Sequence, residues 1–125
     1  DIVTIEELRD QYPSGTDQQR IRDHIQYYEQ NHDLDYVLLA GDYDKIPTRT
    51  TLNLHPETMY GEPPTFATDG YYACVDPGSD WNSDNDNFYA EAGELDDPYP
   101  DIAVGRLAIN NVNIMTSIVD EIIER

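Results

Sequence analysis

The sequence predicts an α/β fold in which a mostly parallel sheet is flanked by helices. A short apolar run, Tyr36–Ala40, is typical of a buried parallel strand, and it ends in the pair Gly41-Asp42. A capped amphipathic helix precedes this run, and a second short apolar run, Ile102–Gly105, leads into another helix. The order helix, strand, long excursion, strand, helix therefore indicates a layered structure built on parallel strands.

Two helices are predicted before the first strand. The segment Thr4–Glu7 has the form of a capping box and predicts a helix over Ile5–Gln11. The segment Thr16–Gln19 repeats the signature with glutamine in the last place and predicts a second helix over roughly Asp17–Gln30. Three apolar or aromatic residues recur in it at helical spacing, so this helix is expected to lay one stripe on the sheet: Ile21, Ile25 and Tyr28.

The middle of the chain is predicted to be irregular. The region Tyr43–Thr68 contains four prolines and no periodicity, which predicts a long loop with one short extended piece near Thr50–Leu54. Asp69–Val75 is interpreted as a tyrosine-rich strand that pairs with a neighbour after the following acidic loop. Asn110 or Asn111 caps the last helix, whose broad apolar face consists of Val112, Met115, Ile118, Val119, Ile122 and Ile123.

The length of 125 residues suits a single domain. Asp1–Thr4 is interpreted as the end of a strand, and Glu121–Arg125 stops within a helical pattern that has no cap after it. We therefore expect residues 1–125 to form one α/β subdomain that is a fragment of a longer protein.

The composition is strongly acidic, with 26 acidic residues against 7 basic ones and a formal net charge of −19. This charge disfavours nucleic acid, anionic membranes and phosphate groups as partners, and no transmembrane run or lipidation motif is present, so we expect no membrane insertion. Much of the excess lies between Asp69 and Asp101. Crowded carboxylates repel each other unless cations lie among them, which leaves two interpretations open: a metal site or a solvated acidic loop.

Within this region, residues 80–91 have the spacing of a calcium loop of the EF-hand type. Oxygen-bearing side chains occupy the first, third, fifth, seventh and twelfth positions: Asp80, Asn82, Asp84, Asp86 and Glu91. Asn85 stands where glycine is usual, and asparagine tolerates the left-handed conformation better than most residues. Asn87 replaces the usual aliphatic residue and the flanks are not two amphipathic helices, so a true EF-hand is not expected. We predict a calcium site within Asp76–Glu91, and disfavour magnesium because it dehydrates reluctantly.

Candidates for catalysis are few. Cys74 is the only cysteine, which excludes an internal disulfide, and a buried structural thiol is favoured over a nucleophile because this residue lies inside a predicted strand. The same position disfavours a dyad with His55, and His24 and His32 are no closer in sequence. The segment Gly41–Asp44 is similar to part of the binuclear metallophosphoesterase motif, but the other metal-ligating motifs of those enzymes are absent.

Three segments in this order resemble the amino-terminal subdomain of gingipain-type cysteine peptidases, and the resemblance covers nearly the whole chain. They are YVLLAGD at 36–42 with Ile46-Pro47 after it, TDGYY at 68–72, and YPDIAVGRL at 99–107. The resemblance implies the first of two subdomains of a caspase-like α/β catalytic domain in a secreted or surface-attached bacterial endopeptidase. It also implies that the catalytic histidine and cysteine belong to the second subdomain, so this chain carries neither.

The resemblance further implies a calcium ion shared between the G-D aspartate and the loop after the tyrosine-bearing segment. The positions in this sequence similar to those ligands are Asp42, the carbonyl of Val75, Asp84 or Asp86, the carbonyl of Tyr89, and Glu91. The loop is longer and more acidic here than in the family pattern, which permits a second ion. Together with the loop spacing, the predicted metal set is Asp42, Val75, Asp80, Asn82, Asp84, Asp86, Tyr89 and Glu91.

Two hypotheses about function follow. The leading one is a non-catalytic, calcium-stabilised amino-terminal subdomain of a gingipain-like secreted cysteine endopeptidase, whose partner is the second, catalytic subdomain and whose substrates are proteins or peptides. The alternative is a stand-alone secreted calcium-dependent binding or adhesion module without peptidase activity. We also predict that Arg106, at the end of its strand, pairs with a nearby carboxylate.

Overall fold

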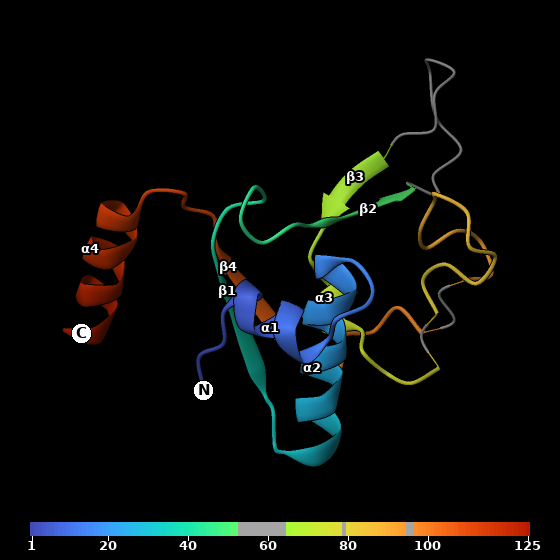
Figure 1. Cartoon of the computed structure of the whole chain (residues 1–125), viewed down its shortest axis with the longest axis horizontal. Helices are drawn as coiled ribbons and strands as arrows, with labels where there is room; N and C mark the ends of the chain where they lie inside the picture. Colours follow the sequence, from blue (N-terminus) through green and yellow to red (C-terminus); the bar gives the residue numbers. More distant parts are fainter. Residues whose placement is uncertain (53–64, 79, 95–96) are drawn as a thin grey trace.

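The computed structural model describes residues 1–52, 65–78, 80–94 and 97–125. The chain forms a mixed α/β structure, as the sequence predicts (Figure 1). In order, its elements are α1 (Ile5–Gln11), α2 (Asp17–Asn31), β1 (Tyr36–Ala40), β2 (Arg49–Leu52), β3 (Thr65–Thr68), α3 (Gly70–Ala73), β4 (Ala103–Leu107) and α4 (Val112–Ile123). β1 pairs with β4 in parallel, and β2 pairs with β3 in an antiparallel hairpin.

The parallel pair β1–β4 aligns Tyr36 with Ala103 at one end and Ala40 with Leu107 at the other. α1 and α2 lie against one face of this pair, where Leu39 packs with Ile21 and Ile25 (Figure 1). The first strand was predicted to be buried, and this prediction was wrong for the face of the strand that the helices do not cover. On that face Tyr36 is 74% exposed and Leu38 is 57% exposed. Alternate residues of a strand point to opposite faces, and helices cover only one of them.

Both predicted capping boxes form. The Thr4 and Thr16 hydroxyls accept hydrogen bonds from the amides of Glu7 and Gln19, and those two side chains accept from the threonine amides in return. α1 therefore begins and ends as predicted, and α2 extends one residue beyond its predicted end. The two helices are joined by Asp17, whose carboxylate accepts hydrogen bonds from Arg9 at 2.7 and 3.1 Å and from Arg20 at 2.9 Å.

This junction makes the stability dependent on pH. The hydrogen bond from Arg9, followed by the one from Arg20, holds the pKa of Asp17 below its ordinary value although partial burial opposes the shift. Because the folded-state pKa is lowered, the contribution is present above the unfolded aspartate pKa of about 4 and is lost as the pH falls through the folded-state pKa.

We expect Asp17→Asn to lower the free energy of unfolding by about 0.5–1 kcal/mol near neutral pH, because Arg9 is half exposed. The difference from the wild type should shrink as the pH falls through the folded-state pKa of Asp17, because the native carboxyl then becomes protonated as well. Urea unfolding at neutral pH and across the acid range measures it. Asp10→Asn, an exposed change on α1, serves as the control and should have no such pH dependence.

The segment predicted as a strand at Asp69–Val75 is instead the short helix α3 followed by its cap, so that prediction was wrong. All five residues 71–75 are buried, whereas a strand in a one-sided sheet buries alternate residues. A helical turn lets Tyr71 and Tyr72 both enter the core, and the Tyr72 hydroxyl donates to the carbonyl of Pro47. The segment after the acidic loop still lies beside α3, because the carbonyl of Ala73 accepts from the amides of Asp101 and Ile102.

Other boundaries also differ from the predictions. The region expected to be one long loop contains the hairpin β2–β3; β2 accounts for the extended piece predicted near Thr50, but its partner β3 was missed. The expected strand at Asp1–Thr4 is irregular, and Ile2 is fully exposed. Ile102 is buried as predicted, but the second strand begins one residue later and is only partly buried.

The predicted pairing of Arg106 is confirmed. Its Nε and Nη2 atoms each donate to the carboxylate of Asp69 at 2.7 Å, and its Nη1 atom donates to the carbonyls of Gly41 and Ile46 at 2.8 Å. Asp69 stands directly before α3, so one guanidinium ties β4 to the turn after β1 and to the start of α3.

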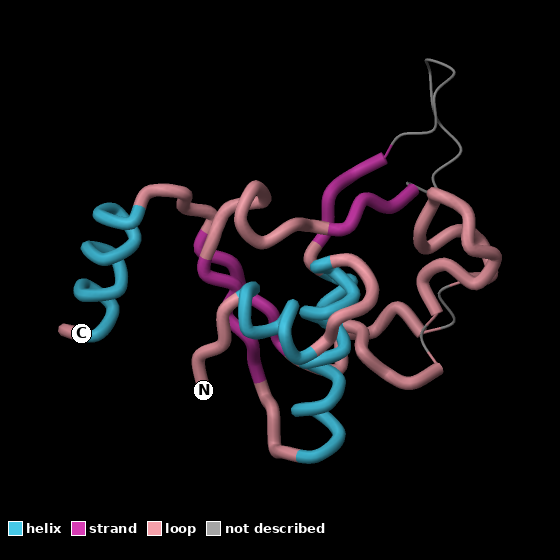
Figure 2. The backbone as a smooth tube through the Cα atoms, viewed as in Figure 1, coloured by secondary structure: helices cyan, strands magenta, loops and turns pink. Residues whose placement is uncertain are grey.

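The last helix, α4, begins after Asn111, whose side chain accepts from two amides of its first turn. Its predicted apolar face is present but largely uncovered. Four of its residues are exposed, namely Val112, Val119, Ile122 and Ile123, and two are half-buried, namely Met115 and Ile118. Figure 2 shows α4 standing apart from the other helices, at the far side of the parallel pair. Of the helices that the structure describes, none has the length and apolarity needed to cross a bilayer.

Candidate cation site in the acidic loop

Three carboxylates converge in the acidic loop. Ligand oxygens of Asp84, Glu91 and Glu94 all lie within 4.8 Å of one another. Partial burial, followed by the neighbouring charges of Asp86, Asp84 and Glu94, raises the pKa of Glu91. The neighbouring carboxylates therefore add to the effect of burial in disfavouring the charged form of Glu91.

Glu94 is the buried member of this carboxylate trio, at 7% exposure. Its Oε2 atom accepts from the amide of Glu91 at 3.1 Å, but its Oε1 atom is buried and has no hydrogen-bond partner among the described residues. A buried carboxylate oxygen without a partner is strongly disfavoured, and a metal ion is one of the few groups that compensate for it. This oxygen is the clearest sign of a ligand in the loop.

Two members of the trio, Asp84 and Glu91, are among the predicted ligands, whereas Glu94 is not. The EF-hand spacing ends at Glu91, so the template stopped one turn too early. A turn in which the amide of Glu94 donates to the carbonyl of Glu91 at 3.0 Å brings the later glutamate back beside the earlier one. The E-x-x-E spacing at these positions was the available signal, because a single tight turn brings residues three apart close together.

The other predicted loop ligands shape the loop through hydrogen bonds of their own. Asp80 accepts from the amide of Asn82, and Asp86 accepts from the amide of Phe88. The Asn82 side chain donates to the carbonyl of Asp86 at 2.9 Å. Asn85 adopts the left-handed conformation expected at the glycine position, with φ of 59°. Whether Asp80, Asn82 or Asp86 also ligates a cation stays a prediction.

The remaining predicted ligands lie outside the trio. Asp42 accepts from the amide of Tyr43 at 2.8 Å, and its charge acts on Arg106. The carbonyl of Val75 accepts from the Gln26 side chain. An ion shared between Asp42 and the loop therefore also stays a prediction.

Three aromatic side chains, Tyr71, Trp81 and Tyr89, pack together beside the acidic loop and form what we call the aromatic wall. Trp81, the only tryptophan of the chain, is buried with its ring 5.4 Å from that of Tyr71 in an edge-on arrangement. The amide of Ala90 donates to the carbonyl of Trp81 at 2.9 Å and closes the loop at its base. Ala90 itself has φ of 57°, a conformation that non-glycine residues rarely adopt. The fluorescence of Trp81 should therefore report directly on the loop.

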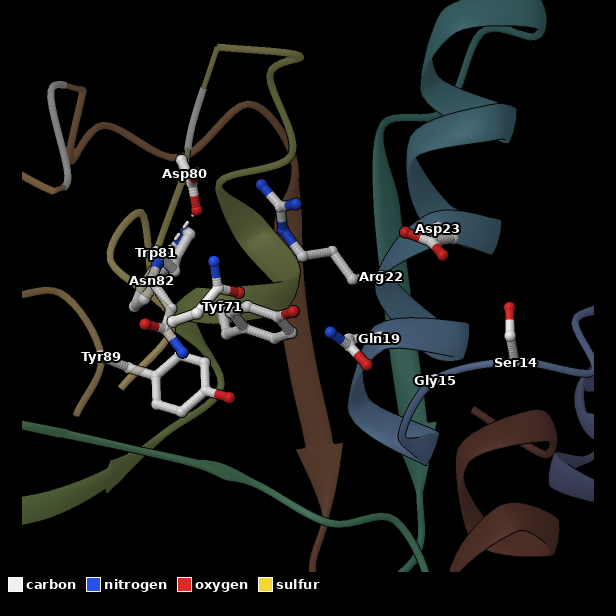
Figure 3. A pocket seen from close by; sticks show the side chains of 11 residues that line it. Ser14, Gly15, Gln19, Arg22, Asp23, Tyr71, Asp80, Trp81, Asn82 and Tyr89 are labelled. Carbon is white, nitrogen blue, oxygen red and sulfur yellow. Dashed lines mark hydrogen bonds between the residues drawn. The ribbon is translucent and has the colours of Figure 1, made fainter. Parts of the chain in front are cut away.

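A cavity of about 420 Å³ separates this wall from the start of α2. Figure 3 shows Gln19, Arg22 and Asp23 of α2 on one side of it, with Tyr71 and Tyr89 facing them. None of the carboxylate trio lines the cavity.

Cys74 has the surroundings of a structural thiol. It caps α3 and does not lie in a strand, but it is buried as predicted, and burial, followed by the charge of Asp101, raises its pKa. Its Sγ atom donates to the carbonyl of Pro98 at 3.7 Å. His55, the partner considered for it, lies outside the described residues. A raised pKa and burial both disfavour a nucleophile.

Comparison with known proteins agrees with this architecture. The model of peptidase family C25 matches residues 1–125, the whole chain. Neither a curated protein nor a solved structure matches the chain. The helices and the parallel β1–β4 pair are consistent with a caspase-like first subdomain.

Proposed function

The chain belongs to peptidase family C25, the gingipain family, and on that premise we propose that it is a non-catalytic, calcium-stabilised subdomain of a cysteine endopeptidase. The observation that carries the calcium proposal is the buried, unpartnered oxygen of Glu94 within the carboxylate trio. Membership of the family supports proteolysis as the activity to which this chain contributes.

The non-catalytic role is supported by the state of Cys74. A cysteine peptidase needs a thiolate activated by a nearby base. Here burial disfavours the thiolate, and the one hydrogen bond described for the thiol goes to a carbonyl. We propose that the nucleophile and its histidine lie in a second subdomain of the parent protein, as the resemblance to gingipain-type peptidases implies.

Calcium is proposed over other cations because of the donor set. Asp84, Glu91 and Glu94 offer hard oxygen ligands, and further oxygens of this acidic loop would complete the six to eight that calcium requires. Cysteine or histidine, which zinc prefers, is absent from the trio. We also propose, as the resemblance to gingipain-type peptidases implies, that Asp42 and the carbonyl of Val75 share an ion with the carboxylates of the loop.

The exposed apolar surfaces support a subdomain over a stand-alone adhesion module. Tyr36 and Leu38 on the open face of β1, and Ile122 on α4, present apolar area of the kind that a second subdomain covers. We further propose that the parent is secreted or attached to the cell surface, where calcium concentrations suit modules that bind it with Kd values of roughly 0.1–1 mM.

Calcium titration followed by Trp81 fluorescence tests the site. We expect a saturable change in the wild type, with a Kd of roughly 0.1–1 mM. Glu91→Gln and Glu94→Gln should each weaken binding by about tenfold or more, because each removes a charged ligand. Asp33→Asn, an exposed acidic residue far from the loop in sequence, is the matched control and should bind like the wild type.

Two outcomes would contradict the proposal. One is a wild-type fluorescence that does not respond to calcium at any concentration. The other is an unchanged Kd in both glutamine variants, which would move the ion away from the carboxylate trio.

A further inference from the structure

We infer that Arg49, at the start of β2, positions the acidic loop for cation binding by holding Tyr89 in a cation–π stack. Its guanidinium lies 4.1 Å from the ring centre of Tyr89 and 4.6 Å from that of Tyr71. The inference deepens the proposed calcium site and rests on it for its effect on affinity, whereas the effect on the loop itself does not require a metal.

Arg49 is held in an unusual way. It is only 6% exposed, and its Nε and Nη2 atoms have no hydrogen-bond partner in the described part of the chain. A buried arginine is ordinarily paired with a carboxylate. Although the chain has 26 acidic residues, no described one forms a salt bridge with this guanidinium. The faces of two tyrosine rings therefore supply the stabilisation that an anion would give.

The stack continues into the body of the protein. The guanidinium of Arg22, from α2, lies 5.2 Å from the ring centre of Tyr71, and its Nη2 atom donates to the carbonyl of Cys74 at 2.9 Å. Figure 3 shows Arg22 and Tyr89 on two sides of Tyr71. Arg22, Tyr71, Arg49 and Tyr89 thus form one column that joins α2, α3 and β2 to the loop.

The column ends next to the proposed ligands. Tyr89 stands two residues before Glu91, and the residue between them is fixed by the hydrogen bond from the Ala90 amide to Trp81. Without a cation, the carboxylate trio repels itself and tends to spread the loop. A ring held against a buried guanidinium opposes that spreading, so the ligands are kept close together before the ion arrives.

The direction in which the calcium Kd changes when Arg49 is replaced shows whether Arg49 positions the loop or acts only through its positive charge. If Arg49 acted only as a positive charge near the site, its removal would tighten calcium binding. If it positions the loop, its removal weakens binding although the net charge has become more favourable to a cation. Arg49→Met and Arg49→Lys distinguish these cases, because methionine removes the charge and lysine keeps the charge but lacks the planar group that stacks.

Calcium titration of these variants by Trp81 fluorescence is the first test. We expect the Kd to rise by about tenfold or more in Arg49→Met and by a smaller factor in Arg49→Lys. Leu8→Ala, a core change on α1, controls for general destabilisation and should leave the Kd unchanged. An Arg49→Met Kd that is equal to or tighter than that of the wild type overturns the inference.

Hydrogen exchange of the Ala90 amide in excess chelator is the second test, and it stands even if the wild type binds no calcium. We expect exchange about tenfold faster in Arg49→Met than in the wild type. If Arg49→Met does not fold, Tyr89→Leu removes the stack from the loop side while keeping the main-chain carbonyl, and the same acceleration is expected. Equal exchange rates in the folded variant and the wild type overturn the inference.

Discussion

Arg106→Met should lower the free energy of unfolding by about 3 kcal/mol or more. The guanidinium makes four hydrogen bonds, two to Asp69 and two to main-chain carbonyls of Gly41 and Ile46. Methionine fills similar space but leaves a carboxylate and two carbonyls without their donor. Asp69 is a quarter exposed and regains some water, which keeps the expected loss at the lower end of the range for buried pairs.

Urea unfolding of three variants makes this test specific. Arg106→Lys retains the charge but not the two-pronged geometry, so we expect an intermediate loss. Arg125→Met breaks an exposed pair with Glu121 on α4 and should change the stability by less than about 0.5 kcal/mol. If Arg106→Met were as stable as Arg125→Met, the junction between β4, the turn after β1 and α3 would not depend on this side chain.

Saturating calcium should raise the free energy of unfolding by about 3–4 kcal/mol at roughly 100–1,000 times the Kd. The reason is mass action, because the three carboxylates of the trio converge only in the folded chain. Urea unfolding in calcium and in excess chelator measures the difference.

Glu94→Gln sharpens this prediction, because the order of stability of the variant and the wild type should reverse between chelator and calcium. In chelator the variant should be at least as stable as the wild type, because it removes one negative charge from a mutually repelling group. In calcium it should be less stable, because it loses a ligand. Equal wild-type stability in calcium and chelator, or a variant that stays below the wild type under both conditions, contradicts the assignment.

Local signals in the sequence were sufficient to predict the elements that depend on residues close together in the sequence. The capping boxes at Thr4 and Thr16 fixed the starts of α1 and α2, because both halves of each box lie within four residues. The apolar runs at 36–40 and 102–105 identified the two parallel strands, because each strand is marked by a run of four or five residues that are adjacent in the sequence. The pairing of Arg106 with a carboxylate followed from its position at a strand end, although its partner Asp69 could not be named.

The elements that depend on distant contacts were the ones missed. The Tyr71-Tyr72 pair has strand propensity, but packing in the core makes it helical, and tertiary packing overrides such propensities. β3 finds its partner across a proline-rich stretch that carries no periodicity. Arg49 could not have been singled out, because its two rings come from segments more than twenty residues away in the sequence. Glu94 was missed for a different reason, since the loop template ended before it.

The exposed apolar face of α4 has a consequence for how the isolated chain behaves in solution. With a net charge of −19, separate molecules repel one another at low ionic strength, and this repulsion keeps the apolar helices apart. At about 0.15 M salt the Debye length shortens to about 8 Å, so the helices can approach within contact distance. The chain on its own is therefore expected to stay dispersed in dilute buffer and to associate reversibly as salt is added.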